Sequence, residues 1–262
     1  MTALLEVDEL SIDIGGRRVV DGVSFDVAPG GRLGVIGESG SGKTLTALAT
    51  MGLAPDSATI TGRVRLNGRD LLGQPERALV DVRGAEMAMV FQDPRTALNP
   101  TMRIGRQISE PLRIHHGVRR RAAAMAAEEW CGRVGLPDPA RIARAYPHQL
   151  SGGQRQRVGI AIALACRPAL VIADEPTTAL DVTVQAEIMR LLRELVEQDD
   201  TALVFISHDV ALVSTVVEQV IVMRAGRIVE RAAVDDVVAE PAHDYTRELL
   251  AAARLTHLEA AR

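Results

Sequence analysis

Short apolar segments alternate with turn residues along the N-terminal part of the chain. The segments occupy residues 4–7, 10–14, 19–20, 23–27 and 33–36, and glycine or proline clusters separate several of them. This spacing predicts an antiparallel sheet that leads into a buried strand at 33–36. A helix over 43–53 should follow, ended by Gly52 and Pro55, before strand character returns at 60–72 around an Asn67-Gly68 hairpin turn.

Four continuous apolar runs share one feature, which is a polar or glycine-rich stretch directly after each run. The runs are 33–36, 87–91, 170–173 and 203–206, and they lead into Gly37, Gln92, Asp174 and Ser207. Continuous apolar strands are typical of a parallel sheet covered on both faces, and such sheets bind ligands at the carboxyl ends of their strands. The pattern therefore predicts an α/β fold in which all four strand ends converge on one site.

The residues between the second and third runs carry helical patterns instead. Helices are predicted over 101–116, 119–134 and 153–166, with prolines between them. We interpret residues 1–262 as a single domain, in which 1–92 and 169–262 form the α/β core and 93–168 form an inserted helical lobe. A helix from Asp181 to Gln198, strands near 220–223 and 227–229, and a helix from His243 complete the prediction.

The stretch after the first run fits the phosphate-binding pattern G-x-x-x-x-G-K-[ST]. Its members are Gly37, Glu38, Ser39, Gly40, Ser41, Gly42, Lys43 and Thr44. In this pattern backbone N–H groups curl around nucleotide phosphates, the lysine reaches the β- and γ-phosphates, and the threonine holds Mg²⁺. Lys43 is the only lysine among the 30 basic residues, and an ammonium on a flexible stem suits a phosphate cradle. A chance match would occur in only about 1% of chains of this length.

Two further motifs favour nucleotide chemistry. Asp174 has the position of a magnesium-holding aspartate, and Glu175 can orient and deprotonate the water that attacks a γ-phosphate. Alone, this pair would fit an ordinary exit from strand to loop equally well. The second motif, Leu150-Ser151-Gly152-Gly153-Gln154, places a serine and two glycines at the start of a helix and predicts a second anion site.

These motifs, together with Gln92, Ala179-Leu180-Asp181 and His208, have the order and spacing of the ATP-binding cassette ATPases, and almost the whole chain resembles that family. The resemblance implies a P-loop NTPase (RecA-like) core with an N-terminal antiparallel β subdomain and an inserted α-helical subdomain. It also implies ATP and Mg²⁺ as cofactors, with Thr44, Gln92 and Asp174 near the metal and Glu175 and His208 acting in catalysis.

The family resemblance further implies a head-to-tail dimer. Ser151, Gly152, Gly153 and Gln154 of one subunit would cap the ATP held by the phosphate loop of the other, and Asp181 would lie at the interface. Where the family usually stacks adenine on an aromatic ring, this chain has Ile14, so we expect adenine to rest on aliphatic groups such as Ile14 and Val20.

Additional segments resemble one branch, the oligopeptide, dipeptide and nickel importers. They are Phe91-Gln92-Asp93-Pro94, Ala97-Leu98-Asn99-Pro100, Tyr146-Pro147-His148-Gln149 and Pro241-Ala242-His243-Asp244-Tyr245-Thr246. The branch implies an ATPase subunit at the cytoplasmic face of the membrane, with two membrane-spanning permease subunits and, indirectly, an extracytoplasmic solute-binding protein. A second ATPase subunit, either a paralogue or this chain itself, would complete the assembly. Residues 93–110 would dock the permease, and peptide, nickel or metal chelate remain open as the solute.

The rival interpretation is a soluble cassette ATPase that acts on DNA or ribosomes. The single phosphate loop and the compact stretch between Lys43 and Ser151 disfavour it, and a net charge of −4 gives no broad electrostatic footprint for nucleic acid. A sensor that binds nucleotide without hydrolysis is disfavoured because Glu175 and His208 are both present.

The remaining features exclude several classes of site. Cys131 and Cys166 lack the spacing of a zinc site or a disulfide framework, and the N-terminus lacks the pattern of an export signal. The longest apolar run, 158–166, falls short of the roughly 18 residues that a membrane span needs. His115, His116 and His148 are interpreted as surface or loop histidines rather than metal ligands.

Overall fold

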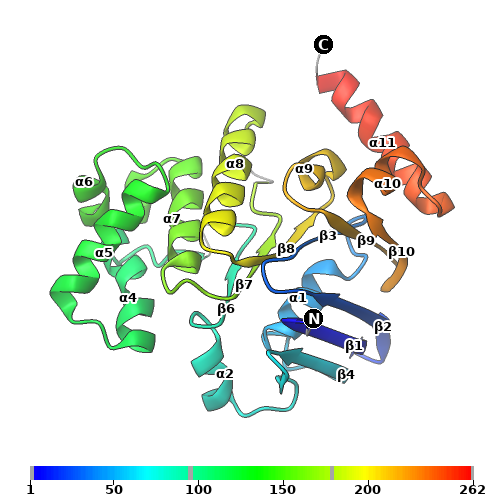
Figure 1. Cartoon of the computed structure of the whole chain (residues 1–262), viewed down its shortest axis with the longest axis horizontal. Helices are drawn as coiled ribbons and strands as arrows, with labels where there is room; N and C mark the ends of the chain where they lie inside the picture. Colours follow the sequence, from blue (N-terminus) through cyan, green and yellow to red (C-terminus); the bar gives the residue numbers. More distant parts are fainter. Residues whose placement is uncertain (1–2, 94–96, 178–179, 261–262) are drawn as a thin grey trace. The chain divides into compact units, whose positions relative to one another are not determined.

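The computed structural model of this chain describes residues 3–93, 97–177 and 180–260. The chain divides into two units, one formed by residues 1–79 with 202–262 and the other by residues 80–201. In the sequence, α2 (Glu76–Val82) spans the boundary between them. Figure 1 shows the elements of each unit along the chain.

The first unit begins with an antiparallel sheet. It has the strand order β2-β1-β4-β5, made of β1 (Leu5–Ile14), β2 (Arg17–Val27), β4 (Ala58–Leu66) and β5 (Arg69–Asp70). The two apolar segments at 4–7 and 10–14 belong to one strand, which bulges at Glu9, where φ is 47°. The predicted hairpin turn is confirmed, because Asn67 and Gly68 have φ values of 51° and 74°, the left-handed pair that such a turn requires.

A second sheet of this unit carries the phosphate-binding loop. β3 (Arg32–Ile36) lies between β8 (Ala202–Ser207) and β9 (Gln219–Arg224), parallel to both, and β10 (Arg227–Ala233) pairs antiparallel with β9. Four helices complete the unit: α1 (Lys43–Thr50), α9 (Val210–Ser214), α10 (Val234–Ala239) and α11 (Asp244–Ala260). α9 packs closely on β3, since a methyl group on Gly34 would lie 2.5 Å from Val213 Cγ1.

The second unit combines two parallel strands with helices. β6 (Met87–Val90) pairs with β7 (Leu170–Asp174), and both strands are fully buried, as their continuous apolar sequences predict. The helices are α4 (Ile104–His116), α5 (Arg120–Arg133), α6 (Pro139–Arg144), α7 (Gly152–Leu164) and α8 (Val182–Gln198), with a 3₁₀ turn at Pro147–Gln149. α4, α5 and α6 pack together around the buried side chains of Ile108, Trp130 and Ile142.

No helix in the described part of the chain has both the length and the apolarity needed to cross a membrane.

Candidate functional site

The glycines of the phosphate-binding loop adopt backbone conformations that other residues rarely reach. The loop joins β3 to α1, and Gly37, Gly40 and Gly42 have φ values of 154°, 81° and 102°. A methyl group on Gly37 would lie 2.2 Å from the carbonyl oxygen of Met223, and one on Gly42 would lie 3.1 Å from Val20 Cγ2. Without side chains there, the loop can curl tightly, as a phosphate cradle requires.

Lys43 begins α1 and its ammonium group turns back into the loop. Nζ donates hydrogen bonds of 2.8 Å to the carbonyl oxygens of Gly37 and Glu38, and the residue is only 5% exposed. α1 has no side-chain cap at its N-terminus, so the first turn of the helix directs backbone N–H groups toward the loop. A buried ammonium, a curled backbone and a helix N-terminus together fit the phosphates of ATP.

Parallel pairing brings His208 to the same sheet edge as the phosphate-binding loop. Ile36, the last residue of β3, stands opposite Ser207, the last residue of β8. Gly37 and His208 therefore continue from adjacent strand ends, and His208 is exposed there. Asp209 begins α9 by accepting hydrogen bonds from the N–H groups of Ala211 and Leu212, at 2.9 and 3.2 Å, which fixes the chain directly after His208.

The second unit joins Gln92 to Glu175 in the same way. Val90 of β6 stands opposite Ala173 of β7, and Gln92 Nε2 donates a 2.9 Å hydrogen bond to Glu175 Oε2. Asp174, the last residue of β7, is 3% exposed. The predicted strand ends thus meet in two pairs, one in each unit, while the convergence of all four on one site stays a prediction.

The described residues contain no group of three or more histidine, cysteine or acidic side chains that could hold a metal ion alone. Magnesium needs few protein ligands, because it keeps several waters and binds phosphate oxygens. The carboxylate of Asp174, the hydroxyl of Thr44 and the side-chain amide oxygen of Gln92 are groups of the kind that Mg²⁺ binds; that they hold one ion together stays a prediction.

The motif at residues 150–154 provides an exposed helix N-terminus. Ser151 Oγ accepts a hydrogen bond from Gln154 N at 3.3 Å, and Gln154 Oε1 accepts one from Ser151 N at 3.0 Å, which is a reciprocal capping box. Ser151 and Gly152 are exposed, and a methyl group on Gly153 would lie 2.8 Å from Val184 Cγ1. The arrangement leaves the start of α7 open to an anion on another molecule.

Asp181 supports the neighbouring helix. Its Oδ1 accepts a 3.0 Å hydrogen bond from Val184 N and so begins α8, the helix whose Val184 packs on Gly153. Asp181 is itself exposed, as an interface residue would be. Ala179 of this motif lies outside the described residues.

The two aliphatic residues expected beneath adenine differ in exposure. Ile14 is half-buried, whereas Val20 is fully buried and packs against Gly42. Val20 therefore supports the phosphate-binding loop from below and offers no surface to a base, which corrects the expectation for this residue. The alternating pattern around Val20 in the sequence does not show that the phosphate-binding loop covers this side chain.

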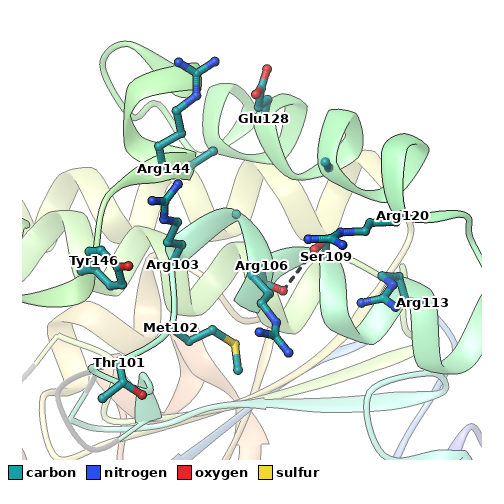
Figure 2. A pocket seen from close by; sticks show the side chains of 13 residues that line it. Thr101, Met102, Arg103, Arg106, Ser109, Arg113, Arg120, Glu128, Arg144 and Tyr146 are labelled. Carbon is teal, nitrogen blue, oxygen red and sulfur yellow. Dashed lines mark hydrogen bonds between the residues drawn. The ribbon is translucent and has the colours of Figure 1, made fainter.

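A hollow of about 720 Å³ lies among α4, α5 and α6 (Figure 2). Five arginines line it, together with one acidic residue, Glu128: they are Arg103, Arg106, Arg113, Arg120 and Arg144. Among the described residues, Arg113, Arg120 and Arg144 form no ion pair, while Arg106 lies 3.7 Å from Glu110. One wall belongs to the predicted docking segment 93–110, of which residues 94–96 lie outside the described residues.

One contact to the phosphate-binding loop was not predicted from the sequence. The hydroxyl oxygen of Tyr245, in the first turn of α11, accepts a 2.9 Å hydrogen bond from Glu38 N. The sequence did contain a hint of this role. Tyr245 is one of only two tyrosines in the chain, and it lies in the segment 241–246, to which no function had been assigned.

Comparison with known proteins places these features in a wider group. The family model described as "ABC transporter" matches residues 20–178. A putative peptide import ATP-binding protein of Brucella abortus (strain 2308) is 50% identical over 254 residues, which cover 95% of this chain and 76% of the relative. The dipeptide transport ATP-binding protein DppD of Escherichia coli (strain K12) is 47% identical over 255 residues, covering 95% and 78%.

Solved structures are similar as well. The dimeric ATP-binding cassette MJ0796, in a post-hydrolysis state bound to ADP and Pi, superposes with a TM-score of 0.77 at 27% identity, covering 88% of this chain and 98% of that one. The cbiO1 protein of Clostridium perfringens, part of the ABC transporter complex cbiONQ, gives a TM-score of 0.78 at 25% identity, covering 99% and 100%.

Proposed function

Because this chain belongs to the ABC transporter family of ATP-binding proteins, we propose that it is the ATP-hydrolysing subunit of a peptide importer. ATP hydrolysis is the activity of the family. The relatives named for peptide and dipeptide import support peptides as the solute class, in preference to nickel or a metal chelate. They also favour transport over the soluble alternative that acts on DNA or ribosomes.

The hydrogen bond between Gln92 and Glu175 is the observation that carries the proposed chemistry. When bound, ATP would supply the phosphoanhydride bond that is broken, and Mg²⁺ would neutralise charge on the phosphates. Glu175 accepts the proton of the attacking water, and Gln92 holds the carboxylate in the orientation this requires. Asp174 and Thr44 provide oxygen donors for the metal, and Lys43 leaves the loop carbonyls to donate to phosphate oxygens.

Further residues complete the site in this proposal. His208, at the strand end beside the phosphate-binding loop, donates to the γ-phosphate. The exposed N-terminus of α7, with Ser151 and Gly152, closes over the nucleotide bound to a second ATPase subunit, and Asp181 lies at that interface. The second subunit is a paralogue or another copy of this chain.

The arginine-lined hollow supports a docking place for the permease at the cytoplasmic face of the membrane. Figure 2 shows Arg103 just before α4, Arg113 on α4 and Arg120 at the start of α5 bordering the hollow. Five arginines with a single acidic residue, Glu128, in the lining of the hollow favour an acidic segment of the partner. We therefore assign this hollow to an acidic cytoplasmic loop of the permease.

The assembly is tested by purifying the Glu175→Gln variant from its native cells, in detergent with ATP, and identifying bound proteins by mass spectrometry. Two polytopic membrane proteins and a second ATPase are expected, and a solute-binding protein would identify the cargo. Recovery with ribosomes or DNA and without any membrane protein would overturn the transport function. The same variant purified without ATP serves as the control for nucleotide-dependent closure.

The docking assignment has its own test. Arg113→Glu with Arg120→Glu should abolish recovery of the permease while the ATPase activity of the isolated chain stays unchanged. Arg190→Glu with Arg193→Glu reverses the same amount of charge on the exposed face of α8 and should leave recovery intact. Equal recovery from both double variants would exclude the hollow as the docking place.

A further inference from the structure

Tyr245 connects the C-terminal helix to the phosphate-binding loop. Its hydroxyl oxygen accepts the 2.9 Å hydrogen bond from Glu38 N, and its side chain is almost fully buried, with the residue 6% exposed. The guanidinium carbon of Arg224, at the end of β9, lies 4.7 Å from the centre of the tyrosine ring. The ring is therefore held between the sheet and the loop, with its oxygen directed at one particular peptide group.

The same loop residue is held from its other side by Lys43. Nζ of Lys43 donates to the carbonyl oxygen of Glu38 at 2.8 Å, while Tyr245 binds the N–H group of that residue. If the ammonium moves to phosphate when ATP binds, the Glu38 carbonyl loses this donor. The hydrogen bond to Tyr245 does not involve the ammonium, so it can persist in both states.

The start of α11 is anchored in a way that fixes the position of Tyr245. Glu230 on β10 accepts hydrogen bonds from Ala242 N at 2.8 Å and His243 N at 3.0 Å, and His243 Nδ1 accepts one from Tyr245 N at 3.1 Å. Burial acts to raise the pKa of Glu230, but the hydrogen bonds to its carboxylate outweigh burial and lower that pKa. The anchor is thus ionised at neutral pH and accepts both bonds.

The sheet behind the loop provides the remaining contacts. The carbonyl oxygen of Met223, next to Arg224, closely approaches Gly37, and Gly226 N donates a 3.0 Å hydrogen bond to Ser41 O. These contacts hold the loop at Gly37 and at Ser41 through backbone atoms of β9 and the following turn. Tyr245 supplies a side-chain contact to the segment between them.

We propose that Tyr245 is a positioning residue of the nucleotide site, whose phenol holds the phosphate-binding loop in its curled form before ATP arrives. This inference rests on the proposed role of residues 37–44 in binding ATP. When the loop is already curled, binding of the nucleotide does not have to offset the entropy lost in ordering the loop. Tyr245 therefore raises nucleotide affinity and leaves the chemical step unchanged. Burial also raises the pKa of Tyr245, which keeps the phenol neutral at physiological pH.

The test replaces the phenol and keeps the ring. Tyr245→Phe should weaken the binding of Mg²⁺-ADP, measured by calorimetry on the full chain, by about three- to tenfold, the effect of losing one neutral hydrogen bond. In steady-state ATPase assays the variant should show a higher KM for ATP with kcat within about twofold of the wild type. Tyr146→Phe, at the other tyrosine of the chain, is the matched control and should change neither quantity.

Each outcome separates this inference from the proposed function. If the wild-type chain does not bind Mg²⁺-ADP, the assignment of residues 37–44 as the nucleotide site fails. If the wild type binds and Tyr245→Phe binds equally well, only the role of Tyr245 is overturned. A variant with lower kcat and unchanged KM would have lost either active protein or a contact made only in the transition state, and both results would overturn the positioning role.

A measurement on the wild type keeps the proposal testable should Tyr245→Phe fold poorly. Without nucleotide, the amide proton of Glu38 should exchange with solvent far more slowly than an unprotected peptide, because the phenol accepts its hydrogen bond. Exchange of that amide at the unprotected rate would contradict the proposal.

Discussion

Gln92 donates a hydrogen bond from Nε2 to Oε2 of Glu175 over 2.9 Å, although 83 residues separate them in the chain. Parallel pairing of β6 with β7 places them at adjacent strand ends. Glu175 has a φ of 42°, a left-handed conformation that costs a non-glycine residue about 1 kcal/mol. Such strained residues cluster at functional sites, and here the conformation directs the carboxylate to the amide of Gln92.

Replacing Glu175 by Gln should leave ATP binding within about twofold and lower kcat by at least about 100-fold, the usual contribution of a general base. The amide keeps an oxygen that can accept from Gln92 but takes up no proton from water. Phosphate release and nucleotide affinity measured on the same preparation check both halves of the prediction. Normal turnover in Glu175→Gln would refute the assignment of the base.

Replacing Gln92 by Leu should lower kcat about tenfold, because a carboxylate without its hydrogen-bonding partner is less well oriented toward water. Nucleotide affinity measured without Mg²⁺ should change little, since Gln92 does not belong to the phosphate-binding loop. Gln198→Leu makes the same substitution at the exposed end of α8 and serves as the control, for which kcat should not change. An unchanged kcat in Gln92→Leu would mean that the hydrogen bond has no part in hydrolysis.

Alanine substitutions at Gly37 and Gly40 should destabilise the protein to different extents, because only one of the two positions lacks room for a side chain. Gly37→Ala places a methyl group 2.2 Å from the Met223 carbonyl oxygen, so strand β9 must shift, and the free energy of unfolding should fall by about 3 kcal/mol. Gly40→Ala meets nothing within 4 Å, so only its φ of 81° is unfavourable, at about 1 kcal/mol. Denaturant unfolding without nucleotide measures both values, and equal losses would contradict the packing argument.

Hydrophobic pattern predicted the strands of the parallel sheets well, because strands buried on both faces must be apolar throughout. β3, β6, β7 and β8 were each found from one continuous run. The solved cassettes described above confirm the predicted fold class. The short helices α2, α6, α9 and α10 were missed, since five to seven residues hold too few turns to show a helical period.

Motifs located the candidate site residues, because a phosphate loop needs glycines and a lysine at fixed spacing. The roles proposed for these residues stay predictions. Contacts between distant residues could not be obtained in the same way: Tyr245 and Glu38 lie 207 positions apart, and no local pattern relates them. The burial of Val20 beneath Gly42 was equally hidden, since it depends on how the loop covers the strand.

Arg133 should stabilise the helical unit through two contacts. Its guanidinium carbon lies 4.1 Å from the centre of the Trp130 ring. Its Nη2 lies 2.9 Å from Oδ2 of Asp199, whose side chain is 11% exposed. Arg133→Met would leave that carboxylate unpaired and lower the free energy of unfolding by about 2 kcal/mol. Arg190→Met, which breaks an exposed pair with Glu194, should cost less than about 0.5 kcal/mol. Similar losses in thermal or denaturant unfolding would contradict the role of burial.

The two cysteines should make the free energy of unfolding fall at alkaline pH. Both thiols are free and buried, and burial raises the pKa of each from 9.0 to about 11. Above pH 9 the unfolded chain releases these protons while the folded chain retains them. Their contribution to stability is therefore complete below pH 9 and is lost as the pH rises to about 11, by about 1.4 kcal/mol per pH unit for each thiol.

Few other groups titrate in this range, because the chain has one lysine and two tyrosines and its other basic residues are arginines. Subtracting the pH profile of a Cys131→Ala, Cys166→Ala variant from that of the wild type isolates the two thiols. The difference in unfolding free energy should be constant below pH 9 and shrink above it. Rapid alkylation of either thiol in the folded protein at pH 8 would contradict the prediction, since a protonated, buried thiol is not a nucleophile.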